Sequence, residues 1–156
     1  MDGPGAVQWQ WSAYEGLSRE DLYAILARRQ EVFIIEQQCI YPDLDGVDPH
    51  AWHLMGWVDV EGRRELLAYL RCVHPGVIYA EVSLGRVLSA PAARGTGIGR
   101  ALLAEALGQV GRVYPGRAVR ISAQLYLERF YAGFGFVSVG TPYDEDGIAH
   151  IEMLRP

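Results

Sequence analysis

The segment from residue 87 to residue 100 carries the residue types best suited to chemistry. It reads VLSAPAARGTGIGR, an apolar run that passes through small residues directly into a predicted helix. Glycines at positions 95, 97 and 99 let backbone N–H groups approach an anion, and the helix N-terminus adds about half a positive charge. The segment therefore predicts an anion cradle, for which a pyrophosphate is the natural occupant.

The glycine spacing excludes two common nucleotide motifs. A dinucleotide fingerprint would need glycine in place of Arg100, or glycine or alanine in place of Leu102. A nucleoside-triphosphate loop needs a Gly-Lys-Ser/Thr sequence, and the chain contains no lysine. A glycine-rich turn that only caps a core helix is the alternative for this segment taken alone.

Two motifs together resemble the GCN5-related N-acetyltransferases, the GNAT family. Arg94-x-x-Gly97-x-Gly99, after an apolar strand, is similar to the acetyl-CoA motif of that family. The later segment Phe130-Tyr131-x-x-Phe134-Gly135-Phe136 resembles its second motif, in which a tyrosine protonates the departing thiolate. The resemblance implies a GNAT fold and acetyl transfer from acetyl-CoA to a primary amine.

Three further segments extend the resemblance to the bacterial ElaA-like group over nearly the whole chain: FIIEQ at 33–37, YPDLDG at 41–46 and DGIAHI at 146–151. That group is poorly defined as to substrate. The resemblance therefore indicates the fold and the cosubstrate, and leaves the acceptor amine open.

The resemblance also implies which residues contact acetyl-CoA. Backbone groups of one strand would face the pantetheine arm, and amides after Arg94 would face the pyrophosphate. Gln124 stands where many relatives have a contacting asparagine, so it keeps an amide with a longer reach. The implied contacts are Val87, Leu88, Ser89, Arg94, Gly95, Thr96, Gly97, Ile98, Gly99, Arg100, Gln124 and Phe130.

Acetyl transfer to an amine needs a base and an acid. An amine with the pKa of lysine lies roughly three units above neutral pH, so freeing its lone pair costs about 4 kcal/mol. Glu81 is the candidate base, because it precedes Arg94 on the central strand and shares a face with Ser83 and Val87. A solvated glutamate with a water relay is the alternative. Tyr131 is the candidate acid, and an ordinary core aromatic is the alternative to that role.

Four residues are candidates for the acceptor side: Arg29, Glu36, His53 and His150. For each, a structural role is an alternative, as an ion pair on a helix face or a histidine bonded to a backbone carbonyl. Aspartates at 43, 45 and 48 make a loop acidic, so it either recognises an ammonium group or caps a turn. The loop lacks the closing glutamate of a calcium site, and no metal is expected.

The elements around these residues predict an α+β domain at residues 7–156, after a short leader at 1–6. Periodicity predicts three helices. The first follows Ser18 and ends at a loop at 39–48, and the others span 97–113 and 125–133. Strands are expected at 7–11, 52–60, 66–73, 78–89, 119–123, 136–139 and 148–154. They predict a central mixed, mostly antiparallel sheet of about six or seven strands flanked by helices. A parallel crossover joins the strands at 79–89 and 118–123.

Composition narrows the partners. The 156 residues carry 19 acidic and 14 basic side chains, a net charge of -5, and no basic patch for nucleic acid. The two cysteines lie far apart, without the spacing of a metal site, which predicts a cytoplasmic protein. The sequence has no apolar run long enough to span a membrane, so no membrane binding is expected. A small-molecule amine is the expected acceptor, and a homodimer is compatible with these expectations. A non-catalytic acyl-CoA sensor is the alternative function, and Tyr131 favours catalysis over it.

Overall fold

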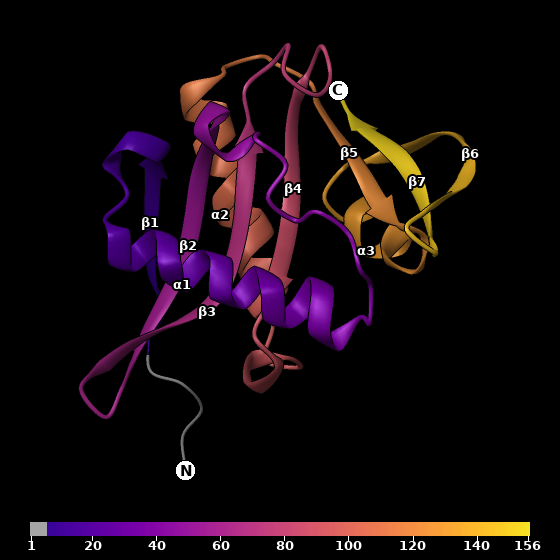
Figure 1. Ribbon diagram of the computed structural model, residues 1–156. Helices are drawn as coiled ribbons and strands as arrows, with labels where there is room; N and C mark the ends of the chain where they lie inside the picture. The colour runs from indigo at the N-terminus through magenta and orange to yellow at the C-terminus, as the bar shows by residue number, and fades with distance from the viewer. Residues whose placement is uncertain (1–5) are drawn as a thin grey trace.

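The computed structural model describes residues 6–156 and confirms the α+β prediction (Figure 1). Positions 1–5 of the expected leader lie outside the described residues. The strands are β1 (Gln8–Ala13), β2 (Ala51–Val60), β3 (Arg63–Val73), β4 (Val82–Ser89), β5 (Val119–Gln124), β6 (Val137–Glu145) and β7 (Ile148–Arg155). The main helices are α1 (Arg19–Arg29), which a π-helical segment η2 (Gln30–Glu36) continues, α2 (Ile98–Val113) and α3 (Glu128–Ala132).

Seven strands form one mixed sheet in the order β1-β2-β3-β4-β5-β7-β6. Every neighbouring pair is antiparallel except β4 and β5, which are parallel and joined through α2. The sequence therefore predicted the meander of β2, β3 and β4 and the single parallel crossover correctly. A parallel pair needs a long connection, which explains why the glycine-rich segment and α2 lie between these two strands.

The two long helices cover opposite faces of the sheet (Figure 1). On one face, Ile25 of α1 and Val32 of η2 pack with Met55 and Tyr69. On the other, the apolar side of α2 packs with alternate residues of the same strands, including Leu54. Because successive strand side chains point to opposite faces, β2 and β3 supply both cores. The central strands are therefore held between the two helices.

β4 and β5 separate soon after they meet. Only Val82 with Val119 and Ser83 with Arg120 are paired between them, and Figure 1 shows the two strands diverging from that point. In β4, Arg86 has a positive φ of 51°, next to an irregularity in the register between β3 and β4. The edge of β4 that follows Ser83 is therefore not paired with β5, and a wedge opens between the strands.

Two predicted strand boundaries were wrong. The expected strand at 78–89 begins only at Val82, because the preceding residues form a turn in which the amide of Gly76 donates to the carbonyl of Tyr79 at 2.7 Å. The expected strand at 136–139 extends to Glu145 as β6, and Asp146 and Gly147 turn it into β7 with φ values of 52° and 83°. Two consecutive positive φ values are typical of a tight hairpin turn.

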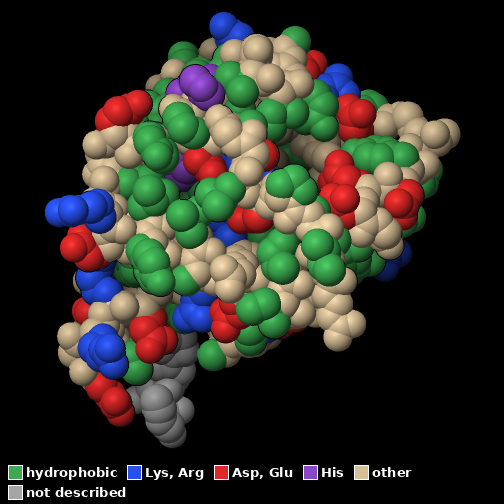
Figure 2. Space-filling model, in the orientation of Figure 1, with side chains coloured by type: hydrophobic (Ala, Val, Ile, Leu, Met, Phe, Trp, Pro, Cys, Tyr) green, Lys and Arg blue, Asp and Glu red, His purple; other side chains and the backbone are tan. Residues whose placement is uncertain are grey.

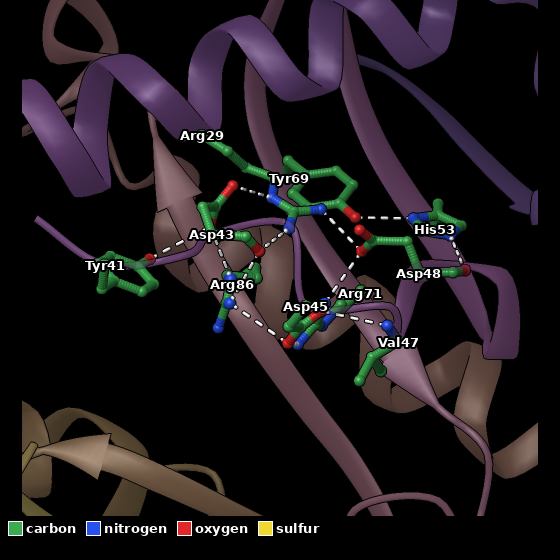
Figure 3. A network of polar contacts seen from close by, with 10 residues as sticks. All are labelled: Arg29, Tyr41, Asp43, Asp45, Val47, Asp48, His53, Tyr69, Arg71 and Arg86. Atoms are coloured by element: carbon green, nitrogen blue, oxygen red, sulfur yellow. Dashed lines mark hydrogen bonds and ion pairs between the residues drawn. The ribbon is translucent and has the colours of Figure 1, made fainter.

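Charged side chains form a partly buried cluster, here called the Arg–Asp network: Arg29, Asp43, Asp45, Asp48, Arg71 and Arg86 (Figure 3). Arg29 donates to Asp48 at 2.7 Å and to Asp43 at 2.9 Å. Arg71 donates to Asp45 at 2.6 Å and to Asp48 at 3.0 Å. Arg86 contacts Asp43 at 2.8 Å and Asp45 at 3.3 Å. The network ties the loop after η2 to α1, β3 and β4.

The network sets the ionisation of its carboxylates. Burial alone would raise the pKa of Asp45, but its hydrogen bonds with Arg71 and the charges of Arg71 and Arg86 outweigh burial and lower it to about 2. Burial also opposes ionisation of Asp48, whose pKa is nevertheless lowered by Arg29 and Arg71. Each aspartate of the loop is paired with arginine. This pairing favours a structural role for the acidic loop over recognition of an ammonium group.

We expect Asp48→Asn to lower the free energy of unfolding by about 3 kcal/mol, because the amide would turn an N–H group toward Arg29 or Arg71 and leave a buried arginine without its carboxylate. Urea unfolding measures the change. Asp59→Asn, at an exposed position of β2, is the matched control and should change stability by less than about 0.5 kcal/mol.

The same variant has an expected pH signature. A carboxylate whose pKa is lower in the folded than in the unfolded chain stabilises the fold above about pH 4 and loses that contribution as the pH falls toward 2. The parent should therefore lose more stability than Asp48→Asn across this interval. Parallel losses in the two proteins would mean that the network does not lower the pKa of Asp48.

Candidate active site

A cleft of about 790 Å³ occupies the wedge between β4 and β5. Its walls come from these strands, the end of η2, the loop after it, α3 and the β6–β7 hairpin. Figure 2 shows this side of the molecule hollowed, with acidic side chains gathered toward the β6 and β7 side. The loop and the hairpin meet where the thiol of Cys39 donates to the carbonyl of Asp146 at 3.3 Å, which bounds the cleft on that side.

The backbone of β4 forms one wall of the cleft. Val87, Leu88 and Ser89, for which the resemblance implied contacts with the pantetheine arm, all line it. Leu88 and Ser89 pair with β3, Val87 lies at the irregularity in that register, and none of the three pairs with β5. Polar backbone groups on this edge are therefore available to a ligand that can complete the hydrogen bonds of a strand.

The predicted anion cradle lies at the start of α2. Gly97 is the residue before the helix, with φ +86°, and Gly95 has φ +79°. A Cβ at either position would meet no other atom within 4 Å, so the space beside both glycines is open. Gly99 lines the cleft next to the ring of Phe130, whereas the other cradle residues adjoin the lining without entering it: Gly95, Thr96, Gly97, Ile98 and Arg100.

Arg94 and Gln124 both line the cleft, on opposite sides of the wedge. The guanidinium group of Arg94 forms two hydrogen bonds with Glu36, at 2.6 and 2.9 Å, and the pairing lowers the pKa of Glu36. Gln124 ends β5, directly before the turn that leads into α3. Both residues, for which the resemblance implied contacts with acetyl-CoA, therefore lie at the cleft, where Arg94 is held by Glu36.

Tyr131 is buried in α3 and lines the cleft. Its ring packs edge-on against Phe130 and Phe136, with centroids 5.2 and 5.9 Å away. Burial raises the pKa of its hydroxyl, so the phenol stays protonated at neutral pH. Among residues 6–156 the hydroxyl has no hydrogen-bond partner, and it is not enclosed away from solvent. A protonated, unengaged phenol that faces a cleft can donate a proton to a bound molecule.

The four acceptor candidates divide into two pairs. Glu36 and His150 line the cleft. Arg29 and His53 do not: both are fully buried, Arg29 in the Arg–Asp network and His53 between the hydroxyl of Tyr69 and a backbone carbonyl. Burial lowers the pKa of His53 and keeps it neutral. The assignment of Arg29 and His53 to the acceptor site was therefore wrong, because their side chains point into the protein interior.

Glu81, the predicted base, precedes β4 and is not among the residues that line the cleft. Its carboxylate accepts from Arg120 at 3.0 Å, and this hydrogen bond lowers its pKa. A carboxylate that is held by an arginine outside the cleft is poorly suited to take a proton from a substrate. The geometry does not support Glu81 as the base.

Sequence reasoning missed several residues that line the cleft: Tyr79, Ser122, Tyr126, Glu145 and Asp146. Glu145 and Asp146 reach the cleft because β6 is longer than predicted and the hairpin turn approaches Cys39. The Asp146-Gly147 pair is a recognised hairpin signal and could have revealed this turn. No group of three or more His, Cys, Asp or Glu in residues 6–156 is arranged to hold a metal ion.

Comparisons with known proteins agree with this geometry. A family model described as an acetyltransferase (GNAT) domain matches residues 73–155. A UPF0039 protein of Synechocystis is 45% identical over 95% of this chain and 94% of its own length. The solved structure of an acyl-CoA N-acyltransferase from Pseudomonas aeruginosa has a TM-score of 0.90 and 40% identity, over 97% of this chain and all of that one. The chain belongs to the GNAT acetyltransferase family.

Within that family the chain belongs to the ElaA-like group. Protein ElaA of Escherichia coli is 38% identical over 151 residues, which are 96% of each chain. Its solved structure has a TM-score of 0.88 and covers 96% of this chain and 99% of that one. The GNAT family uses acetyl-CoA as cosubstrate, which fits the open β4 edge and the cradle. None of the helices formed by residues 6–156 combines the length and apolar character that a membrane crossing needs.

We expect Gly97→Asp to abolish acetyl-CoA binding, because it places a carboxylate and a Cβ beside the cradle. Gly116→Asp is the matched control: Gly116 also has a positive φ, of 75°, and open space around it, but it lies beyond the other end of α2. Both variants should lose about 1 kcal/mol of stability through backbone strain. Calorimetry should then detect acetyl-CoA binding only in the control. Equal acetyl-CoA affinities of the two variants would mean that the segment serves only as a helix cap.

Proposed function

We propose that this protein transfers the acetyl group of acetyl-CoA to a primary amine of a small molecule, by direct attack in a ternary complex. The observation that carries the proposal is the unengaged phenol of Tyr131 in the cleft beside the open edge of β4. A non-catalytic acyl-CoA sensor would use the same edge and cradle, but it would need no proton donor there. The free hydroxyl therefore favours the enzyme.

The residues present suit acetyl-CoA as cosubstrate. In this proposal the backbone of Val87 to Ser89 holds the pantetheine arm, and the amides from Gly95 to Arg100 hold the pyrophosphate. Gln124 supplies an amide from the opposite wall, and Phe130 packs beside Gly99. Bound in this way, acetyl-CoA supplies a thioester whose carbonyl carbon the amine attacks.

Tyr131 then acts as the general acid. When the carbon–sulfur bond breaks, its phenol donates a proton to the sulfur, so that a thiol leaves in place of a thiolate. Its raised pKa keeps the phenol protonated until that moment, and the aromatic contacts hold the ring in one orientation. The role needs no rearrangement of α3.

The acceptor side favours a small, positively charged molecule. The contact between Cys39 and the β6–β7 hairpin bounds the cleft, which suits a small amine better than a protein surface. Glu145 and Asp146 make the hairpin side of its rim acidic, and the net charge of -5 attracts cations. We place the protein in the cytoplasm, where its two free, buried cysteines would stay reduced.

A screen of acceptors tests the proposal. Amines, polyamines, amino acids, aminoglycosides and peptides are incubated with the protein and acetyl-CoA, and released CoA thiol is measured. Acetylation of a small amine supports the proposal. Tight binding of acetyl-CoA without transfer to any member of the panel would favour the sensor.

We expect Tyr131→Phe to lower the rate of single-turnover acetyl transfer by 10²- to 10⁴-fold, because the ring is kept and only the proton donor is lost. Acetyl-CoA affinity and melting temperature should change little, since the hydroxyl has no partner to lose. Tyr23→Phe, at an exposed position of α1, is the control for the substitution itself. A rate within threefold of the parent would exclude Tyr131 as the acid.

A further inference from the structure

The cleft lacks an assigned proton acceptor, and His150 is the residue whose position fits that task. It lies in β7 opposite Gln124, the last residue of β5, and it lines the same cleft as Tyr131. Its side chain is only 9% exposed, and its ring stacks on that of Tyr143 with centroids 6.1 Å apart. The imidazole is therefore held in one orientation at the acceptor side of the cleft.

The hydrogen bonds of His150 define the state of its ring. Nδ1 lies 2.8 Å from the carbonyl oxygen of Ile148. A carbonyl can only accept, so Nδ1 must carry a proton, and in the neutral ring Nε2 has a lone pair. Nε2 in turn lies 3.3 Å from a carboxylate oxygen of Glu145. Two acceptors thus face each other, and the pair is complete only when a proton or an N–H donor joins them.

We propose that His150 takes the proton from the ammonium group of the acceptor, and that Glu145 orients its ring and offsets the charge it gains. This inference rests on the proposed function and deepens it, because it also specifies the acceptor as an amine that arrives protonated. The ammonium group would donate to both facing acceptors before the transfer. Glu145 then stabilises the imidazolium ion, and its half-exposed carboxylate lets the proton pass on to solvent.

The protons balance across the reaction. The first leaves the ammonium nitrogen for Nε2 of His150, which frees the lone pair to attack the thioester carbon. The second leaves the same nitrogen as the amide forms, and it replaces the proton that Tyr131 gives to the departing sulfur. The products are an N-substituted acetamide, CoA thiol and one proton, which His150 releases to solvent.

The surroundings of His150 leave Glu145 as the charge in direct contact with the ring. Tyr143 on β6 and Tyr79 before β4 stay neutral, because burial raises the pKa of both, that of Tyr79 to about 12. Glu152, two residues along β7, is paired with Arg120 of β5 at 3.1 Å, and Arg120 also holds Glu81. Asp146 follows Glu145 in the hairpin turn, and its backbone carbonyl accepts a hydrogen bond from the thiol of Cys39.

Comparing a protonated with an unprotonated amine substrate shows whether His150 acts as a base or has only a structural role. Ethylamine is protonated at neutral pH, whereas 2,2,2-trifluoroethylamine is largely unprotonated and needs no base. His150→Asn keeps an N–H group near the carbonyl of Ile148 and removes the proton acceptor. At neutral pH we expect it to slow single-turnover acetylation of ethylamine by about 100-fold and that of trifluoroethylamine by less than about threefold. His50→Asn, an exposed histidine outside the cleft, is the matched control.

The outcomes distinguish this inference from the proposed function. Equal slowing with both amines would make His150 structural and overturn the inference, while a parent that acetylates either amine still supports the function. A selective loss for ethylamine in Glu81→Gln, with none in His150→Asn, would assign the base to Glu81. A parent that acetylates neither these two amines nor any member of the acceptor panel contradicts the proposed function, and the inference falls with it. Acetyl-CoA affinity and melting temperature, measured for each variant, identify those that fail to fold.

Discussion

The open edge of β4 is the constraint on which the rest of the site depends. A central strand is normally paired on both sides, because unpaired backbone groups in a protein interior cost free energy. Here β4 meets β5 through two residue pairs that end at Ser83, and within the unpaired part that follows Arg86 takes a positive φ. Such a conformation persists only where the surroundings hold it, and the contacts of Arg86 with Asp43 and Asp45 provide that hold.

The Arg–Asp network supplies this support, and its members Asp45, Arg71 and Arg86 also line the cleft. Three arginines and three aspartates balance in charge, so the network carries no net charge around its buried members Arg29, Asp48 and Arg71. Removing one partner of a buried ion pair costs far more than the intact pair contributes, so the loop after η2 is strongly held in place. Arginine suits this role because its planar group bonds several carboxylates at once. The same loop carries Cys39 to the β6–β7 hairpin, and the network thereby helps to shape the acceptor side of the cleft.

How much the sequence could predict depended on whether a feature is local. The cradle, α2 and the parallel crossover lie in one continuous stretch, whose glycines and apolar periodicity are readable without tertiary contacts. Arg29 and His53 were misplaced because the partners that bury them lie far along the chain, on the loop and on β3. The hairpin was missed because Gly140 and Pro142 interrupt the alternation within β6, although the strand continues through an irregular register against β7.

The same distinction explains why the cosubstrate could be predicted from the sequence and the acceptor could not. The acetyl-CoA side is made largely of backbone groups, whose positions follow from glycines and from one strand and helix. The acceptor side is made of side chains that converge from η2, the following loop, β5, β6 and β7. His150 illustrates the difference, since its place in a strand is local but its facing carboxylate comes from a hairpin partner. Because Asp45, Arg71 and Arg86 of the Arg–Asp network line the cleft together with these side chains, the contacts that hold the loop after η2 in place also set part of the cleft wall.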